Sequence, residues 1–473
     1  MRRALLLLAA LGLAACPAPA SRSGKAAAGA RSAGAGNRLN VLLVTIDTLR
    51  ADHLGAYGYA RATSPKIDAL AGRGVLFEQA YTYWPKTRGS FVALLTGRLA
   101  AQSGYGKSHP RLLDFNATLA SVLHDAGYDT TAVVDNPNVA ASLGYSKGFV
   151  RYRETWEEAA LASEVDRSRA ITRDAVSYLR AASKDHPFLL WLHYVNPHAP
   201  YEPPAPFDAA FLDAEATRGP LLQAVNGFHG GVPKQWAKGE RSLGFYVSQY
   251  DGEIAAVDAE VGQVLEALEH SAVRDQTLVL LTSDHGESLG EHGYFFDHGE
   301  NLFDPSLRIP LVMAGPGIER GRRSSELAST LDLVPTVLDA VKVSYPPDLG
   351  GTSLLGAARG ETLARDRLPG QNDRNLLAAW DRRFKLVATP NESGSSYALY
   401  DRELDPGETR DVGPENAEQL REERRELELF RERIDAQLVR TRRLLEGRPE
   451  GEALSAEACE RLKALGYVVP GCS

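Results

Sequence analysis

Cysteine is scarce in this sequence, with three residues among 473, too few for a disulfide scaffold or a metal site built from thiolates. Clusters of basic residues are lacking too. The formal net charge is −8 and no block of lysine and arginine could neutralise phosphates, so we expect no nucleic-acid partner. What is present is ordinary for a globular protein: 44% of residues are hydrophobic and 24% charged, and the length suffices for one large α/β domain and a smaller one.

The N-terminus has the pattern of an export signal. A basic start at residues 1–3 precedes an apolar run at residues 4–15, which is too short to span a bilayer and is typical of a signal peptide. The run ends in Leu-Ala-Ala-Cys16, which resembles the lipobox of bacterial lipoproteins. That resemblance implies cleavage before Cys16, acylation of its thiol and a membrane anchor in the cell envelope, periplasmic or on the outer membrane. Ordinary secretion is the alternative.

Acidic residues follow two predicted buried strands. Residues 278–281 form a short apolar run, and Asp284 and His285 come just after it, followed by Gly286, which lets the backbone turn. The apolar run at residues 41–46 ends at Asp47. Because ligands in open α/β sheets collect at the carboxyl ends of strands, we expect these side chains to bind one cation. A polar turn with a capping aspartate is the alternative.

Helices and strands alternate along the rest of the chain, which indicates an α/β fold. A helix is predicted at residues 90–97, with Pro85 and Gly89 breaking the chain ahead of it and Thr87 in the loop at its N-terminus. The other predicted elements are a helix at 65–74, a strand at 75–77, a helix at 117–125, strands at 130–134 and 188–195, a helix at 243–270, strands at 376–380, 384–387 and 398–401, and a helix at 416–448.

A series of motifs resembles the sulfatase family of the alkaline phosphatase superfamily. In order they are TIDTLRADHLGAYGY, SPKIDALAGRGVLFEQAY, ALLTGR, LHYVNPHAPYEPP, TSDHGESLGEHG, SLRIPLVMAGPG, DLVPTVLDA and LYDRELDPGETRDV, covering residues 40–412. The tail EACERLKALGYV resembles the ending of many bacterial members. The resemblance implies a large mixed, mostly parallel sheet between helices and a small C-terminal subdomain with an antiparallel sheet and a helix.

These observations divide the chain into four parts. They are a lipoprotein-type signal peptide (1–15), a flexible tether rich in Ala, Gly and Ser (16–37), a sulfatase-like catalytic domain (38–370) and the C-terminal subdomain (371–473). Cys459 and Cys472 lie in the last part and could pair in an oxidising compartment.

The sequence departs from the resembled family at the nucleophile. Sulfatases carry a cysteine there that is oxidised to formylglycine, and the register of ALLTGR places Thr87 at that position. The β-carbon of threonine carries a methyl group and cannot become that aldehyde. Branches with threonine resemble phosphodiesterases and phospho-group transferases, in which the hydroxyl attacks directly. Phe91 stands where sulfatases carry arginine, and Gly89 where they carry proline.

The resemblance and the chemistry of the residues assign a site. Asp47, Asp284, His285 and Thr87 would hold one divalent cation, with zinc or manganese preferred over calcium because the set includes an imidazole. Arg88, with Lys86, would attract an anionic ester at the helix N-terminus. His198 would contact the ester oxygens, and His298, rather than His292, would serve the leaving group. The alternatives are a helix cap for Thr87 and an ordinary core or surface histidine for His198.

The resulting expectation is a metal-dependent hydrolase or transferase that cleaves phosphate esters or diesters through a covalent phosphothreonine. A sulfuric ester hydrolase of the same fold is the first alternative. The second is a catalytically inactive binding lipoprotein, which the changes at Phe91 and Gly89 would suit.

Overall fold

A computed structural model describes residues 38–239, 241–345, 348–447 and 456–465, which all belong to one unit of the chain, residues 36–473. The predicted signal peptide, the tether with Cys16, and Cys472 lie outside these ranges. Cys459 is disulfide-bonded. Within the described ranges, every helix is too short or too polar to cross a bilayer.

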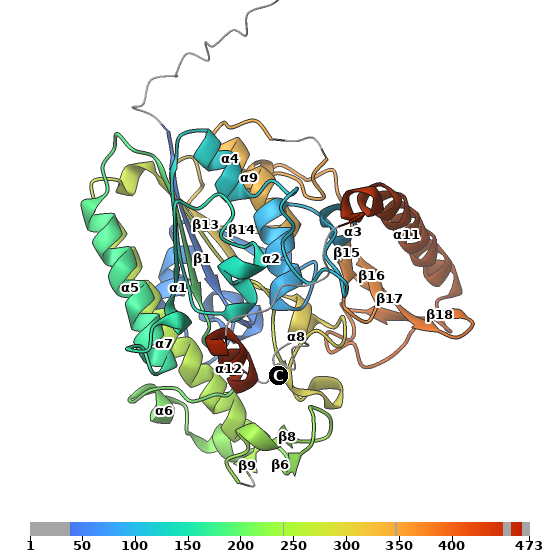
Figure 1. Cartoon of the computed structure of the whole chain (residues 1–473). Coiled ribbons are helices and arrows are strands. Elements are labelled where there is room, and N and C mark those ends of the chain that lie inside the picture. The colour runs from blue at the N-terminus through green and yellow to red at the C-terminus, as the bar shows by residue number, and fades with distance from the viewer. Residues whose placement is uncertain (1–37, 240, 346–347, 448–455, 466–473) are drawn as a thin grey trace, which may run out of the picture. The chain divides into compact units, whose positions relative to one another are not determined.

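The core of the fold is a mixed, mostly parallel sheet, as the sequence predicts (Figure 1). Only β13 runs antiparallel to its neighbours among the eight strands of this sheet. The strand order is β14 (Arg322–Ser329), β2 (Val75–Tyr81), β13 (Leu311–Ala314), β10 (Thr277–Ser283), β1 (Asn40–Ile46), β5 (Phe188–Tyr194), β3 (Asp129–Val134) and β4 (Arg151–Glu154).

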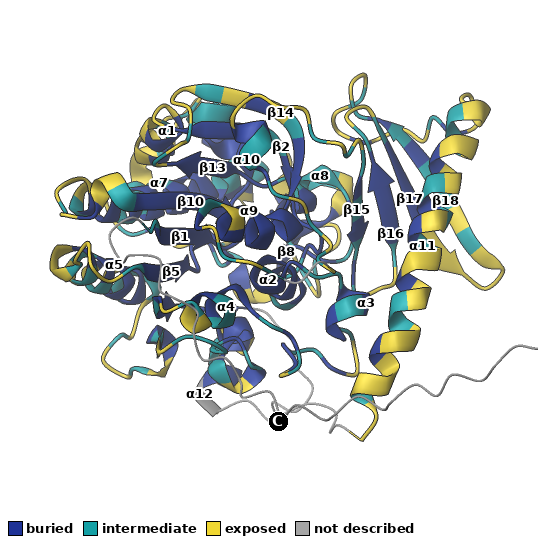
Figure 2. Ribbon diagram, turned by 90° about the horizontal axis from the view of Figure 1, so that it is seen from above, coloured by how far each residue is buried: buried dark blue, intermediate teal, exposed yellow. Residues whose placement is uncertain are grey.

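Helices cover both faces of this sheet (Figures 1 and 2), which explains the continuous apolar run of β1. Val41 and Leu43 point into one core cluster, whereas Leu42 and Val44 point into the other. The first cluster includes side chains of α2 (Thr87–Thr96), α4 (Leu119–Asp125) and α9 (Leu333–Ala340). The second includes side chains of α1 (Pro65–Ala71), α5 (Glu164–Ala181) and α7 (Leu243–Glu269).

One predicted boundary is wrong. The helix expected from Ser90 begins at Thr87, with Lys86 as its N-cap residue, so Thr87 is the first helical residue and not a loop residue. Gly89 therefore lies inside the helix. A β-carbon at that position would come within 2.4 Å of the Trp84 ring, so glycine is required there by close packing although it disfavours a helix.

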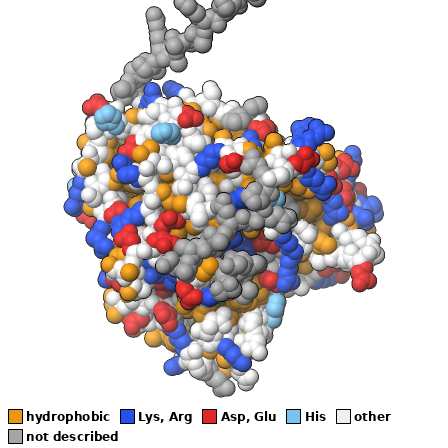
Figure 3. Space-filling view, viewed as in Figure 1, with side chains coloured by type: hydrophobic (Ala, Val, Ile, Leu, Met, Phe, Trp, Pro, Cys, Tyr) orange, Lys and Arg blue, Asp and Glu red, His pale blue; other side chains and the backbone are white. Residues whose placement is uncertain are grey.

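The C-terminal part is an antiparallel sheet covered by a helix, as predicted, but its first strand begins at Leu368, so the predicted boundary between residues 370 and 371 falls within that strand. Its strands are β15 (Leu368–Gln371), β16 (Leu377–Trp380), β17 (Phe384–Asn391) and β18 (Gly394–Asp401), and α11 (Ala417–Leu445) packs on β16 and β17. The inward side of α11 includes Leu427, Phe430 and Ile434. Charged side chains of both signs cover its exposed side (Figures 2 and 3), as expected for a solvated face.

Short elements complete the described residues. The helices are α3 (Ala100–Ser103), α6 (Phe207–Ala210), α8 (Asp304–Leu307), α10 (Leu355–Ala358) and α12 (Ala456–Ala464). The strands β6 (Leu221–Leu222) and β9 (Arg241–Ser242) pair with each other, as do β7 (Ala224–Val225) and β8 (Val232–Pro233), and β11 (Ser288–Leu289) and β12 (Phe295–Asp297).

Candidate active site

Parallel pairing of β1 and β10 brings Asp47 and Asp284 to one edge of the sheet. Ile46 pairs with Ser283, so each aspartate is the next residue after a matched pair. The chain then turns at Gly286, whose N–H donates to the carbonyl of Ser306. A β-carbon at this glycine would lie 2.0 Å from the carbonyl oxygen of Pro305, so only glycine allows this close approach.

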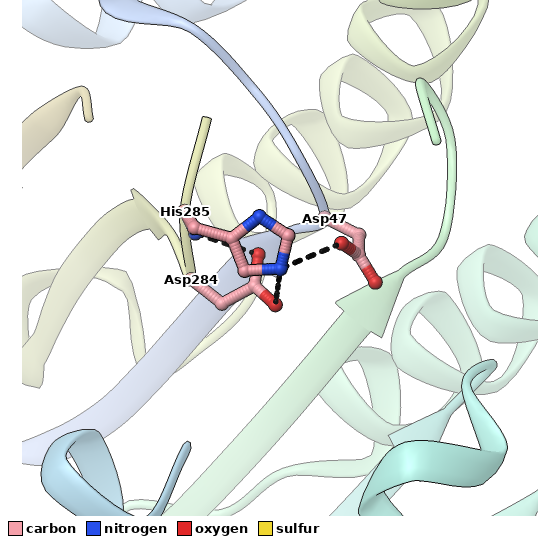
Figure 4. Close-up of side chains that lie close together, drawn as sticks. All are labelled: Asp47, Asp284 and His285. Carbon is pink, nitrogen blue, oxygen red and sulfur yellow. Dashed lines mark hydrogen bonds and ion pairs between the residues drawn. The ribbon is translucent and has the colours of Figure 1, made fainter. Parts of the chain in front are cut away.

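His285 points back at both carboxylates (Figure 4). Its Nε2 lies 3.3 Å from Oδ2 of Asp284 and 3.7 Å from Oδ1 of Asp47. Its Nδ1 donates to the carbonyl of Gly286 at 2.9 Å, so the neutral ring presents a lone pair at Nε2. The described residues donate no hydrogen bond to Oδ1 of Asp47 or Oδ2 of Asp284. Two carboxylate oxygens without hydrogen-bond donors and one fixed imidazole nitrogen are a donor set that fits a divalent cation.

The electrostatics of the two carboxylates point the same way. Burial, and next the charge of Asp47, raise the pKa of Asp284 well above its usual value. Burial also acts to raise the pKa of Asp47, but the close approach of His193 and the influence of nearby histidines outweigh it and lower the pKa to about 2. Without a cation, the pair therefore favours one ionised and one protonated carboxyl group. A divalent cation would stabilise both in the ionised form.

Thr87 reaches this group from the first turn of α2. Its Oγ1 lies 3.2 Å from Nε2 of His285, and because that nitrogen carries a lone pair, the hydroxyl is the donor. The side chain of Ser90 donates to the carbonyl of Asp284 at 2.7 Å, which fixes the helix start against the end of β10. The structure thus brings together all four residues predicted to hold the cation.

Two further predicted histidines lie beside them. The ring of His298 is 4.0 Å from the ring of His285 and 5.2 Å from that of His198, measured between centroids. Nδ1 of His298 is 3.1 Å from Oε1 of Glu287, and Nδ1 of His198 donates to the carbonyl of Ala199 at 2.7 Å. These contacts fix both ring orientations.

Burial lowers the pKa of His298 well below its usual value, and the charges of His285 and His198 lower it further. Burial also lowers the pKa of His198. Both rings are therefore neutral near pH 7. His292 is exposed and stacks on Phe303, with 3.6 Å between ring centroids, away from this cluster.

The predicted cationic residues flank Thr87. Nε of Arg88 donates to Oδ1 of Asn138 at 2.9 Å, and Nζ of Lys86 lies 4.0 Å from a carboxylate oxygen of Asp373 in the C-terminal part. The contacts described for these two side chains are therefore with Asn138 and Asp373, and not with Asp47 or His285. Their attraction for an anion acts through charge at the helix N-terminus.

Three residues of the site were not foreseen from the sequence. Nδ2 of Asn136, just beyond β3, donates to Oδ2 of Asp47 at 2.5 Å. Nε2 of His193, on β5, lies 3.6 Å from the same oxygen. Thr48 has a positive φ of 54°, an uncommon conformation for threonine, and its N–H donates to Asp284. Asn136 follows a strand end as Asp47 does, so the same rule could have found it. No sequence signal marked the other two.

Comparison with known proteins places the chain in a family. The family model described as Sulfatase matches residues 39–343, and the one described as N-sulphoglucosamine sulphohydrolase, C-terminal, matches residues 290–433. The chain belongs to the sulfatase family. It is therefore a hydrolase fold of the alkaline phosphatase superfamily, as the motifs predict.

Relatives within this superfamily carry different activities in their names. The chain is 26% identical over 412 residues to a Delta 4,5-hexuronate-2-O-sulfatase of Bacteroides thetaiotaomicron, covering 79% of this chain and 84% of that protein. It is 26% identical over 396 residues to the multifunctional alkaline phosphatase superfamily protein PehA of Trinickia caryophylli, covering 67% and 76%. The phosphonate monoester hydrolase of Agrobacterium radiobacter has a similar structure, with a TM-score of 0.70, 22% identity and coverage of 84% and 96%.

Proposed function

We propose that this sulfatase-family protein is a metal-dependent hydrolase or transferase of phosphate esters, including diesters, that uses Thr87 as its nucleophile. The observation that carries the proposal is the position of the Thr87 hydroxyl, 3.2 Å from the Nε2 lone pair of His285 and at the N-terminus of α2. A hydroxyl is a weak nucleophile unless a base or a cation activates it. Because Nε2 of His285 is also a proposed ligand, a cation bound there would occupy that lone pair, and the cation would then be the group that activates the hydroxyl.

The cation would be held by Asp47, Asp284 and His285, with Thr87 as the fourth group. When bound, it would lower the pKa of the Thr87 hydroxyl and neutralise charge on the ester. A donor set of two carboxylates and one imidazole favours zinc or manganese over calcium. One cation is expected per chain.

The reaction follows from the placement of the side chains. Oγ1 of Thr87 gives up its proton to solvent and attacks phosphorus, the bond from phosphorus to the leaving oxygen breaks, that oxygen takes up a proton, and a phosphothreonine forms. Attack by water, or by an acceptor alcohol, then releases the phosphoryl group and restores the threonine. Nδ1 of His198 donates to a backbone carbonyl, so its Nε2 can accept a proton from that attacking group. Burial raises the pKa of Glu287 well above its usual value, so its protonated carboxyl can donate to Nδ1 of His298. The ring proton then lies on Nε2, where it can be donated in a hydrogen bond to the leaving oxygen.

Two observations favour phosphorus over sulfur. Thr87 cannot form the aldehyde on which sulfate ester hydrolysis by this family relies, whereas its hydroxyl can attack phosphorus directly. The second is the 26% identity to a relative whose name, multifunctional alkaline phosphatase superfamily protein, is not restricted to sulfate esters. Sulfate ester hydrolysis is the second candidate, because the chain also resembles a hexuronate sulfatase at 26% identity.

We also propose that the protein acts in the cell envelope, held to a membrane by a lipid on Cys16. The motif at residues 13–16 supports this proposal, and the residue itself lies outside the described ranges. Globomycin treatment of producing cells tests it, because a lipoprotein would then accumulate with its signal peptide attached and a simply secreted protein would not.

Turnover of a nitrophenyl phosphodiester and of a nitrophenyl sulfate tests the proposed function. Protein supplied with zinc or manganese should hydrolyse the diester faster, and Thr87→Ala should abolish this activity. Thr96→Ala, on the last turn of the same helix, is the matched control and should remain active. Faster turnover of the sulfate ester would favour the second candidate. Inertness towards both esters with every metal tested would favour the inactive binding lipoprotein.

A further inference from the structure

His193 faces one carboxylate oxygen of Asp47, and the predicted ligand His285 faces the other. His193 lies on β5, is fully buried, and its Nε2 is 3.6 Å from Oδ2 of Asp47. The opposite oxygen, Oδ1, is the one that faces His285. Nε2 of His193 has no hydrogen-bond partner among the described residues, so it is a buried polar atom directed at a carboxylate.

The surroundings of Nδ1 decide where the ring proton lies. The indole N–H of Trp191 donates to Oγ1 of Thr45 at 2.9 Å. The single hydroxyl proton of Thr45 can then go to Nδ1 of His193, at 3.0 Å, or to the carbonyl of Leu192, at 3.2 Å. When it goes to Nδ1, the neutral ring carries its proton on Nε2, facing Asp47. The other tautomer would set a lone pair against a carboxylate oxygen between two fully buried side chains, which is repulsive.

Phe91 holds this ring in place. Its ring lies 4.7 Å from the ring of His193 in an edge-on arrangement and 5.1 Å from the ring of Trp191. All three side chains are fully buried. Phe91 occupies the position at which sulfatases carry arginine, so in this chain an aromatic contact to His193 stands where a charged side chain would otherwise point toward the nucleophile.

We propose that His193, packed against Phe91, is a positioning residue for Asp47. Together with Asn136, it holds Oδ2 and so directs Oδ1 toward the cation. The proposal rests on the proposed function only in requiring that Asp47 bind a cation. His193 stays outside the binding group itself, since the side chains whose ligand atoms all lie within 4.8 Å of one another are Asp47, Asp284 and His285.

Two polar groups face the same oxygen of Asp47, and the nearer of them, Asn136, is hydrogen-bonded to it. Asn136 donates to Oδ2 at 2.5 Å and His193 approaches the same atom from β5. The hydrogen bond from Asn136, with the Nε2 edge of His193 facing the same atom, favours the orientation of the carboxylate in which Oδ1 points toward His285. Residues that hold a metal ligand in this way typically change metal affinity by about 10- to 100-fold when they are replaced.

Two substitutions separate this role from simple packing. His193→Phe keeps an aromatic ring against Phe91 but removes the donor, and Thr45 can still donate to Leu192. His193→Gln keeps an N–H close to the position of Nε2. His292→Phe is the matched control, because its ring is exposed and stacks on Phe303, away from Asp47.

The measurement is the dissociation constant of manganese or zinc for chelator-stripped protein, by isothermal titration calorimetry, with the melting temperature of the stripped protein alongside. We expect His193→Phe to weaken binding by about tenfold or more, His193→Gln to recover most of that loss, and the control to match wild type. The stripped variants should melt within a few degrees of wild type. Unchanged affinity in His193→Phe would overturn the proposal. So would equal losses in both variants accompanied by a large fall in the melting temperature.

The test of His193 is independent of the test of the proposed function, because metal affinity is measured without turnover. A wild-type protein that binds the cation but cleaves no ester refutes the proposed function and leaves the role of His193 testable by affinity. A wild-type protein that cleaves the diester while His193→Phe binds metal normally refutes the role of His193 alone. A wild-type protein that binds neither metal refutes both.

Discussion

The hydroxyl of Thr87 and the Nε2 atom of His285 lie 3.2 Å apart, although 198 residues separate them in sequence. The first belongs to the start of a helix and the second to the end of a central strand. The contact exists because Ser90, one turn along the same helix, donates to the carbonyl of Asp284. A nucleophile, a fixed imidazole and two carboxylates thus share one small volume, and the predictions below probe each part of it.

Replacement of Thr87 should distinguish its role as the nucleophile from its role as the first residue of α2. Thr87→Ser keeps a hydroxyl on the first turn of α2 and should retain measurable diesterase activity. Thr87→Ala should reduce kcat by at least about 10³-fold, since no other group is placed to form the covalent intermediate. Intact-protein mass spectrometry after rapid acid quenching should show a phosphoryl adduct on wild type that is missing from the alanine variant. Equal rates for all three proteins would contradict the assignment.

Removal of the cation should cost both stability and activity. At a metal concentration about 100-fold above the dissociation constant, binding stabilises the folded state by about 2.7 kcal/mol. Treatment with a chelator should therefore lower the melting temperature in differential scanning calorimetry and abolish turnover, and added metal should restore both. An Asp47→Asn, Asp284→Asn double variant serves as the control and should show no response to the chelator.

Metal affinity should also fall as the pH is lowered. Burial and the charge of Asp47 raise the pKa of Asp284, so protons compete with the cation for that carboxylate. The dissociation constant measured at pH 6 should therefore exceed that at pH 8. An affinity that is the same at both values would show that Asp284 is not a ligand.

His298 should matter most for poor leaving groups. A donor to the leaving oxygen contributes little when that oxygen is already a stable nitrophenolate, and more when it is an alkoxide. We expect His298→Ala to lower kcat for an alkyl phosphodiester by a larger factor than for a nitrophenyl phosphodiester. The same factor for both esters would assign His298 to another step.

The junction of the C-terminal sheet depends on a buried lysine. Lys385 is fully buried, and its Nζ lies 2.5 Å from Oδ1 of Asp304 and 2.6 Å from Oε1 of Glu408. Lys385→Met leaves the buried carboxylate of Glu408 without its cation, although Asp304 keeps its ion pair with Arg402, and should lower the free energy of unfolding by about 3–5 kcal/mol. Arg274→Met, which removes exposed ion pairs with Glu269 and Asp275, should change stability very little. Urea denaturation of both variants checks this prediction.

Glu253 should give stability a pH dependence of known sign. Burial, and next the charge of Glu164, raise its pKa from 4.5 to about 8 in the folded protein. The folded state therefore binds this proton more tightly than the unfolded state. The free energy of unfolding should fall as the pH rises from about 4.5 to about 8, and level off above that. Glu253→Gln removes this contribution, so a less steep fall across the same window is expected in denaturant titrations.

The sequence was enough to predict the order of buried strands, the helix over residues 243–270 and the family motifs. Apolar periodicity, together with glycine and proline residues at the ends of elements, specifies them. The candidate ligands Asp47, Asp284 and His285 could be predicted too, since each follows a run that only a fully buried strand explains. The start of α2 could not, because Gly89 signals a break locally and only its packing against Trp84 makes it helical.

Residues without a local signal were decided by the tertiary structure alone. His193 is the next-to-last residue of an otherwise apolar strand and gains its relation to Asp47 only through the parallel register that pairs it with Thr45. In the sequence, Phe91 indicates only that the arginine of the sulfatase motif has been lost. In the fold, its ring packs on that histidine. No spacing in the sequence predicts the contact of His193 with Asp47 or that of Phe91 with His193. Each contact depends on which strands become neighbours and on which face of the helix packs against them. The strand order and the helix packing are determined by the burial of apolar side chains over the whole sheet.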